Sequence, residues 1–202
     1  MQRVDLPGSA VDVQIGEDLL RISHGVFAQA NGLLVDSLVQ SALQQADPSG
    51  SGAVSCVELY AGAGSFSLGL SRRFDQLWAV ESNPSAVRDL RFNVSRAGRE
   101  NVRVAEGSAE SQLPRLGVHG PDVLLLDPPR AGISPEVHAA IIELAPRRIV
   151  YVSCDPATLA RDLARLCGEG YGSLHVEAFD LFPQTPHVEC LASLQAQGSI
   201  RP

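Results

Sequence analysis

Short apolar runs alternate with runs at helical spacing through most of this chain, beginning near residue 53. The pattern predicts strands over residues 53–60, 76–81, 102–105, 122–127 and 148–153. Helices are expected between and after them, over residues 66–74, 85–98, 135–145 and 157–168. Because strands separated by helices need crossover connections, this alternation predicts an α/β domain built on a parallel sheet.

The end of the chain breaks that alternation. Residues 173–180 and 187–195 have the composition of strands, and residues 181–186 between them are too few for a crossover helix. The last two strands should therefore pair antiparallel. A mostly parallel sheet with a C-terminal antiparallel hairpin resembles the Rossmann-like fold of class I S-adenosylmethionine-dependent methyltransferases.

The first fifty residues differ from the rest of the chain. Two short alternating segments, 11–15 and 19–22, predict a hairpin that ends near Gly25. Apolar residues then repeat at helical spacing from Asn31 until a linker rich in serine and glycine begins at Asp47. The hairpin therefore looks like the end of a larger unit.

Composition limits the possible classes of protein. With 202 residues, 45% of them hydrophobic, the chain can hold one main domain. No apolar run approaches the roughly 20 residues that span a bilayer, and the N-terminus lacks the apolar segment of a signal peptide, so we expect a soluble, cytoplasmic protein. All 16 basic residues are arginine and the net charge is −7, which counts mildly against a nucleic-acid substrate.

The four cysteines show neither the spacing of a zinc site nor the density of a disulfide scaffold. We therefore expect reduced thiols and no metal or iron–sulfur cluster. Cys56 and Cys167 lie in apolar patterns, and Cys190 should face away from its neighbour Glu189, so these three are interpreted as structural.

A glycine turn, Gly62-Ala-Gly64, should lie between the strand at 53–60 and its helix, where a ligand can approach the backbone. A dinucleotide fingerprint would have a third glycine where Ser67 stands, which weakens a pyrophosphate-binding interpretation. Glu81 ends the next strand and could accept hydrogen bonds from a ribose diol. NAD enzymes also place an acid there, so Glu81 alone does not distinguish the two kinds of cofactor. Asp127 ends a strand at the same edge. A plain tight turn and a capping or solvated acid remain alternatives.

Cys154 directly follows the expected strand at 148–153. A strand-end cysteine with a carboxylate downstream suggests a nucleophile and its partner base, although such a cysteine is more often buried and inert. Asp127-Pro-Pro-Arg130 resembles the fourth motif of nucleic-acid methyltransferases. Enzymes that methylate the adenine amino group carry an aromatic residue at the position of Arg130, and arginine cannot stack on the base in the same way. RNA cytosine-5 methyltransferases carry a cysteine in this loop as well as one after the next strand, and here only the second cysteine, Cys154, is present.

Two long motifs in order carry a more specific resemblance. Asp127-Pro-Pro-Arg-Ala-Gly132, followed after sixteen residues by Ile149-Val-Tyr-Val-Ser-Cys-Asp-Pro-Ala-Thr158, resembles the first signature of RNA uracil-5 methyltransferases. Residues 179–189, ending in Pro-His-Val-Glu, resemble the second signature. Phe27-Ala-Gln-Ala-Asn31 is similar to the segment by which these enzymes close over the cofactor. The resemblance covers roughly residues 19–195.

The resemblance implies methylation of uridine C5 in transfer RNA or 23S ribosomal RNA, with S-adenosylmethionine as cofactor. Cys154 would add to C6 of uracil and so create electron density at C5, and Glu189 would afterwards remove the C5 proton. His187 could orient Glu189 or the base, or simply pack. The residues implied around the cofactor are Gln29, Tyr60, Gly62, Gly64, Ser65, Glu81 and Asp127.

Members of this family usually carry further RNA-gripping domains, and some carry an iron–sulfur cluster. This chain has neither the length nor the cysteines for them, so we expect residues 1–25 to be the remnant of a middle or RNA-binding domain and residues 26–202 to be the catalytic domain. Such a domain should bind S-adenosylmethionine but methylate RNA poorly alone. The alternatives are a methyltransferase of another RNA base or of a small molecule, and a non-catalytic module that binds a nucleotide or RNA.

Overall fold

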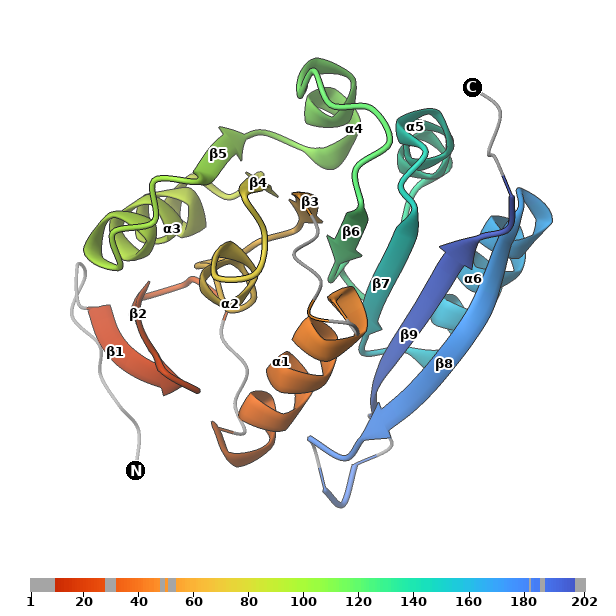
Figure 1. The fold of residues 1–202 in the computed structure, drawn as a ribbon. Coiled ribbons are helices and arrows are strands. Elements are labelled where there is room, and N and C mark those ends of the chain that lie inside the picture. Colours follow the sequence, from red (N-terminus) through yellow and green to blue (C-terminus); the bar gives the residue numbers. More distant parts are fainter. Residues whose placement is uncertain are drawn as a thin grey trace.

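The computed structural model describes residues 10–27, 32–47, 50, 54–181, 183–185 and 188–198. It shows a seven-stranded sheet with helices on both faces and a separate two-stranded hairpin (Figure 1). The strands are β1 (Ala10–Ile15), β2 (Asp18–Ser23), β3 (Ser55–Leu59), β4 (Gln76–Glu81), β5 (Val102–Glu106), β6 (Val123–Leu126), β7 (Arg148–Ser153), β8 (Tyr171–Phe179) and β9 (Glu189–Ala196). The helices are α1 (Gly32–Ala46), α2 (Ser67–Ser71), α3 (Pro84–Arg96), α4 (Ala109–Gln112), α5 (Pro135–Leu144) and α6 (Pro156–Gly168), with a 3₁₀ turn at Leu113–Arg115.

The strands of the large sheet follow the order β5-β4-β3-β6-β7-β9-β8. Strands β3 to β7 run parallel, whereas β9 runs antiparallel to both β7 and β8. The predicted parallel sheet with a C-terminal antiparallel pair is thus confirmed. The chain moves outward from β3 to β5 and then returns to β6, so the direction of winding reverses between β3 and β6. Open α/β sheets bind ligands at such a reversal, beyond the carboxyl ends of the strands.

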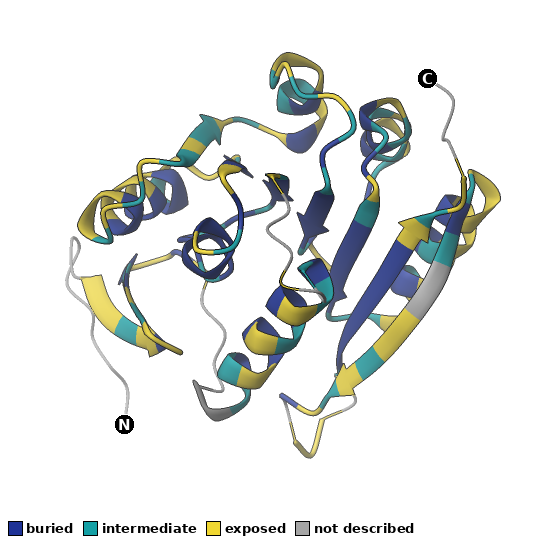
Figure 2. Cartoon of the chain, in the orientation of Figure 1, coloured by how far each residue is buried: buried dark blue, intermediate teal, exposed yellow. Residues whose placement is uncertain are grey.

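Two hydrophobic layers cover the sheet because side chains alternate along each strand. Cys56 of β3 packs with residues of α1, α2, α3 and the hairpin, while the next residue, Val57, packs with residues of α5 and α6 on the other face. Strands β6, β7 and β9 are mostly buried, whereas β1 and β8 are largely exposed (Figure 2).

The N-terminal hairpin shares the core of the large domain. Leu20 and Ile22 of β2 are buried in the same cluster as residues of α1 and the sheet. The carboxylate of Asp89 on α3 accepts hydrogen bonds from the main-chain nitrogen of Ser23 at 2.6 Å and from its hydroxyl at 2.7 Å. These contacts fasten the hairpin to α3. The origin of residues 1–25 as part of another domain stays a prediction.

The sequence pattern did not predict helix α4, which begins at the cap Ser108, nor the 3₁₀ turn that follows it. The four cysteines are free thiols; Cys56 and Cys190 are buried, but Cys167 is exposed. Cys167 comes one residue after the buried Leu166, and one residue turns a helix by about 100° away from its buried face.

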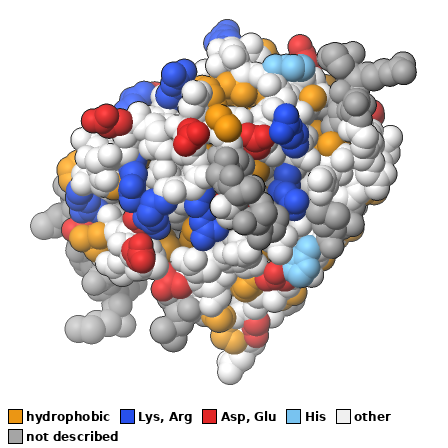
Figure 3. All heavy atoms as spheres, viewed as in Figure 1, with side chains coloured by type: hydrophobic (Ala, Val, Ile, Leu, Met, Phe, Trp, Pro, Cys, Tyr) orange, Lys and Arg blue, Asp and Glu red, His pale blue; other side chains and the backbone are white. Residues whose placement is uncertain are grey.

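Arginines and carboxylates are interspersed on the face of the molecule that Figure 3 shows. Surface ion pairs join Arg72 to Asp18, Arg96 to Asp12, Arg91 to Glu106 and Arg147 to Asp122. This face is therefore mixed in charge rather than uniformly basic. In the part of the chain that the structure describes, no helix is long and apolar enough to cross a membrane, and no cluster of three or more His, Cys, Asp or Glu side chains is arranged to hold a metal ion.

Candidate active site

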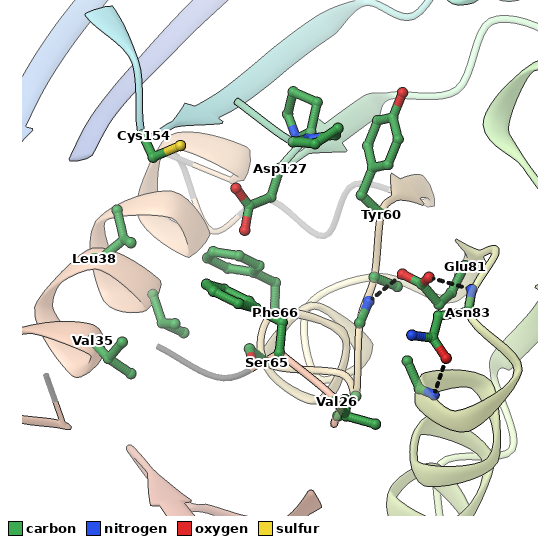
Figure 4. A pocket seen from close by; sticks show the side chains of 18 of the residues that line it. Val26, Val35, Leu38, Tyr60, Ser65, Phe66, Glu81, Asn83, Asp127 and Cys154 are labelled. Atoms are coloured by element: carbon green, nitrogen blue, oxygen red, sulfur yellow. Dashed lines mark hydrogen bonds between the residues drawn. The ribbon is translucent and has the colours of Figure 1, made fainter. Parts of the chain in front are cut away.

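A cavity of about 370 Å³ opens beyond the carboxyl ends of β3, β4, β6 and β7, where the winding of the sheet reverses (Figure 4). One wall is apolar and includes Val26, Val35, Leu38 and Phe66. Carboxylates and a thiol come from the strand ends on the other side. The reversal of the sheet thus brings together polar groups that come from the ends of separate strands.

The glycine turn forms the floor of this cavity. Gly62 has φ +58°, and a Cβ added there would meet nothing within 4 Å, so its backbone is open to a ligand. Gly64 has φ +103°, and a Cβ there would lie 2.9 Å from Cδ1 of Leu90 on α3. The first glycine therefore leaves room for a ligand, and the second lets the turn pack against α3.

Glu81 is held at the cavity wall by two main-chain donors. Its Oε2 accepts a hydrogen bond from the nitrogen of Gly62 at 2.8 Å, and its Oε1 accepts one from the nitrogen of Asn83 at 2.7 Å. Asn83 in turn caps α3 by accepting from Ser85 at 2.9 Å. A carboxylate oxygen has two lone pairs, so each oxygen of Glu81 can still accept a hydrogen bond from a ligand hydroxyl.

Two further acids lie near the cavity with raised pKa values. Burial, and next the charge of Glu189, raise the pKa of Asp127 to about 7. Glu58 is fully buried on β3, the strand that leads into the glycine turn, and its Oε2 accepts a hydrogen bond from the hydroxyl of Ser67 at 2.5 Å. Burial raises the pKa of Glu58 to about 8; Asp127 and Glu81 add to the increase, and the bond from Ser67 opposes it. Glu58 therefore carries a proton at neutral pH.

Cys154 and Glu189 line the same cavity. Cys154 follows the last residue of β7 and is half-buried, and its sulfur points toward Asp127 in Figure 4. Glu189 begins β9 and is 2% exposed. Burial and the charges of Glu189 and Asp127 raise the pKa of the Cys154 thiol, so the thiol is protonated at rest.

Arg130 supplies a cation beside this thiol. Its Nε lies 3.3 Å from Oδ2 of Asp155, which also caps α6 by accepting from the nitrogen of Thr158 at 2.9 Å. Helix α6 also holds the loop that carries Arg130, because the buried carboxylate of Asp162 on α6 accepts a hydrogen bond from the nitrogen of Ile133 at 3.1 Å. Arg130 is thus positioned by α6, the helix that begins just after Cys154.

The structure places most of the predicted site residues in one cavity: Tyr60, Gly62, Ser65, Glu81, Asp127, Cys154 and Glu189 line it. The hydroxyl of Tyr60 points away from Asp127 and Glu81 in Figure 4, and Tyr60 also lines a second cavity of about 220 Å³ with Glu81 and Ser108. Gly64 is not among the residues that line the cavity; it lets the turn pack against Leu90 of α3. Gln29 and His187 lie outside the described residues, so their predicted roles stay predictions.

Several residues of the site were not predicted. Val26, Leu38 and Phe66 form its apolar wall, and Asn83 holds Glu81. Asn83 stands directly before Pro84, a pattern typical of a helix cap, so the sequence did contain a signal for it. No comparable signal marked the apolar wall, because its residues look like ordinary core.

Comparison with known proteins gives the family. The sequence model of the tRNA (uracil-5-)-methyltransferase family matches residues 9–197. The chain belongs to this family. An uncharacterized RNA methyltransferase of Oceanobacillus iheyensis is 38% identical over 90% of this chain and 39% of its own length. Another, from Synechocystis, is 48% identical over 72% of this chain and 31% of its own length.

One solved structure of a uracil-5 methyltransferase has a similar fold. The tRNA (uracil-54, C5)-methyltransferase of Pyrococcus abyssi, solved with S-adenosyl-L-homocysteine, superposes with a TM-score of 0.80 and 29% sequence identity. The match covers 92% of this chain and 44% of that enzyme. The predicted class I methyltransferase fold is confirmed. The chain spans about two fifths of the lengths of the Oceanobacillus and Pyrococcus proteins.

Proposed function

We propose that this chain methylates C5 of uridine in RNA through a covalent bond between Cys154 and C6 of the base, with S-adenosylmethionine as the cofactor. The observation that carries the proposal is the presence of Cys154 and Glu189 in one cavity with Glu81 and the glycine turn. The nucleophile and the base would then reach one substrate ring, next to the groups that would bind the cofactor.

The residues present fit S-adenosylmethionine. Glu81 can accept hydrogen bonds from the ribose hydroxyls, and the open backbone at Gly62 lets the ligand lie close to the turn. The carboxyl groups of Asp127 and Glu189 line the cavity, where they would face a cationic ligand. When bound, this cofactor supplies an electrophilic methyl group on a sulfonium.

Cys154 would act first. Its thiol gives its proton to the carboxylate of Asp127, toward which the sulfur points, so that Glu189 stays unprotonated for the later step. The thiolate adds to C6 of uracil, and the electrons of the C5–C6 double bond move toward C5 and the C4 oxygen. Uracil C5 then becomes nucleophilic enough to accept a methyl group. Arg130 lies close enough to the thiol to lower its pKa and would favour the thiolate.

Glu189 would complete the reaction. After methylation, C5 of the ring still carries its original proton, and the sulfur of Cys154 cannot leave until that proton is removed. A protein base held beside the ring takes this proton, the C5–C6 double bond re-forms, and the thiolate of Cys154 departs. Glu189 is suited to this role because it is buried beside Cys154 on the adjacent strand.

RNA is proposed as the substrate because the family and its named relatives are RNA methyltransferases. Transfer RNA and 23S ribosomal RNA are the two candidate targets.

The test is to identify the methylated nucleoside. RNA is incubated with the protein and S-adenosylmethionine labelled in the methyl group, digested to nucleosides and analysed by mass spectrometry. The proposal predicts label in 5-methyluridine. Label found only in a methylated cytidine or adenosine would contradict the proposal, and so would methyl transfer at an undiminished rate by Cys154→Ala.

A further inference from the structure

Asn93 on α3 joins two parts of the protein that lie far apart in sequence. Its side chain is fully buried. The Nδ2 group donates to the carbonyl of Ala63, inside the glycine turn, at 2.9 Å and to the carbonyl of Arg21 on β2 at 2.9 Å. Its Oδ1 accepts from the main-chain nitrogen of Arg21 at 2.8 Å. One amide thus links the hairpin directly to the floor of the cavity.

Those bonds fix the turn on its far side. The nitrogen of Gly62 is bound to Glu81, the carbonyl of Ala63 is bound to Asn93, and Gly64 packs on Leu90. The turn therefore has little freedom to move while Asn93 is in place. Because the site is buried, water cannot readily replace the amide, and its loss would leave main-chain groups without partners.

The hairpin also reaches the cavity along the chain. Ser23, at the end of β2, is held by Asp89 through its nitrogen and hydroxyl, and its carbonyl accepts from the nitrogen of Val26 at 3.0 Å. Val26 lines the cavity. The hairpin therefore contributes to the cavity at two points, through Asn93 at the turn and through Val26 at the apolar wall.

We propose that Asn93 is a positioning residue that couples the β1–β2 hairpin to the cofactor site, so that order in the hairpin and binding of S-adenosylmethionine favour each other. The inference rests on the proposed function only in taking S-adenosylmethionine as the ligand. Coupling of this kind is reciprocal: if the hairpin strengthens cofactor binding, the cofactor must stabilise the hairpin by the same factor. Both directions can be measured without RNA.

Asn101 offers a matched control. Its Nδ2 also donates to two main-chain carbonyls, those of Ser71 at 2.7 Å and Phe74 at 2.8 Å. Neither acceptor lines the cavity. Replacing Asn101 therefore removes a similar pair of bonds from the same domain without touching the turn or the hairpin.

The experiment combines calorimetry with hydrogen exchange. The dissociation constant of S-adenosylmethionine and the exchange rates of the Arg21 and Ser23 amides, with and without cofactor, are measured for the wild type, Asn93→Leu and Asn101→Leu. We expect cofactor to slow exchange of both amides in the wild type. Asn93→Leu should weaken binding about tenfold, the effect of losing the one buried hydrogen bond that reaches the turn, and should abolish that slowing. Asn101→Leu should lower the melting temperature but leave both readouts unchanged.

A folded Asn93→Leu protein with wild-type affinity and wild-type protection would overturn the inference. If Asn93→Leu does not fold, Asn93→Asp keeps the shape and the acceptor for Arg21 but cannot donate to Ala63, and the same results are expected of it. The wild-type exchange measurement is decisive without any variant: binding without slower exchange in the hairpin contradicts the coupling. Absence of binding by the wild type would instead overturn the proposed function, and the inference with it.

Discussion

Ser153, the last residue of β7, faces Cys190 on the antiparallel strand β9. Antiparallel strands run in opposite directions, so the residues that come next toward the cavity are Cys154, in the bend after β7, and Glu189, the first residue of β9; both line the cavity. The antiparallel connection at the end of the sheet therefore brings the proposed nucleophile and base together, which a parallel crossover strand would not do with these residues.

Glu189→Gln should separate methyl transfer from release. Without the base, the C5 proton stays on the ring and the thiolate of Cys154 cannot leave, so a denaturation-stable adduct of protein with methylated RNA should accumulate on gels. Turnover should fall by about 10²- to 10⁴-fold, the usual contribution of a general base.

Glu177→Gln is the control, because Glu177 lies on β8 and contacts Ser41 and His175 outside the cavity. Turnover and adduct level should remain those of the wild type. Wild-type turnover in Glu189→Gln would mean that another group removes the proton.

Glu81→Gln should weaken cofactor binding. The substitution removes the charge and one acceptor where Gly62 and Asn83 now donate, so we expect the dissociation constant of S-adenosylmethionine to rise about 10- to 100-fold. Glu106→Gln is the matched control, since Glu106 is the register partner of Glu81 on β5 but pairs with exposed Arg91. Equal affinities for the two variants in calorimetry would rule out the ribose role of Glu81.

Arg130→Ala should make Cys154 less reactive. Burial, Glu189 and Asp127 raise the pKa of the Cys154 thiol and the charge of Arg130 partly offsets that increase, so removal of Arg130 leaves less thiolate at a given pH. The rate of alkylation by iodoacetamide at pH 7.5 should fall about two- to fivefold, the modest effect of an exposed cation. The measurement needs a Cys167→Ser background, because Cys167 is exposed. Arg165→Ala, in the last turn of α6, should change nothing; a faster reaction in Arg130→Ala would reverse the assigned role.

The ligand-free protein should lose stability as pH rises from about 5 to about 8. The pKa of Glu58 is raised to about 8 by burial, so between its unfolded and folded pKa values only the folded state holds the proton. The free energy of unfolding should then fall by about 1.4 kcal/mol per pH unit for this group. Denaturant titrations at pH 5 and pH 8 should show a smaller fall for Glu58→Gln. A stability that rises over this range in the wild type would contradict the assignment.

Most strand positions and the longer helices of this chain could be predicted because local patterns determine them, whereas the short α4 was missed. Residues 76–81 and 148–153 were predicted as strands with the bounds that β4 and β7 show, since continuous buried runs mark central parallel strands. The carboxyl-edge location of Glu81 and Asp127 followed from the same pattern. The resemblance to uracil-5 methyltransferases supplied the roles proposed for Cys154 and Glu189.

Contacts between distant segments could not be predicted in this way. Asn93 and Asp89 look like solvated residues of a helix, but both are buried where the hairpin meets α3. Asp162 is likewise buried, where it binds the hydroxyl of Tyr151 at 2.8 Å and supports the loop of Arg130. Sequence periodicity assigns polar residues to the surface, so a buried polar residue that joins two segments becomes visible only in the fold.

RNA that contains 5-fluorouridine gives the most direct test of the reaction proposed here. Fluorine at C5 cannot be removed as a proton, so the chain should be trapped on this RNA in the presence of S-adenosylmethionine as an adduct that survives denaturation. The adduct should be absent with Cys154→Ser and present with Cys167→Ser. An adduct that persists in Cys154→Ser, or a wild-type protein that methylates uridine but forms no adduct, would contradict covalent attack by Cys154.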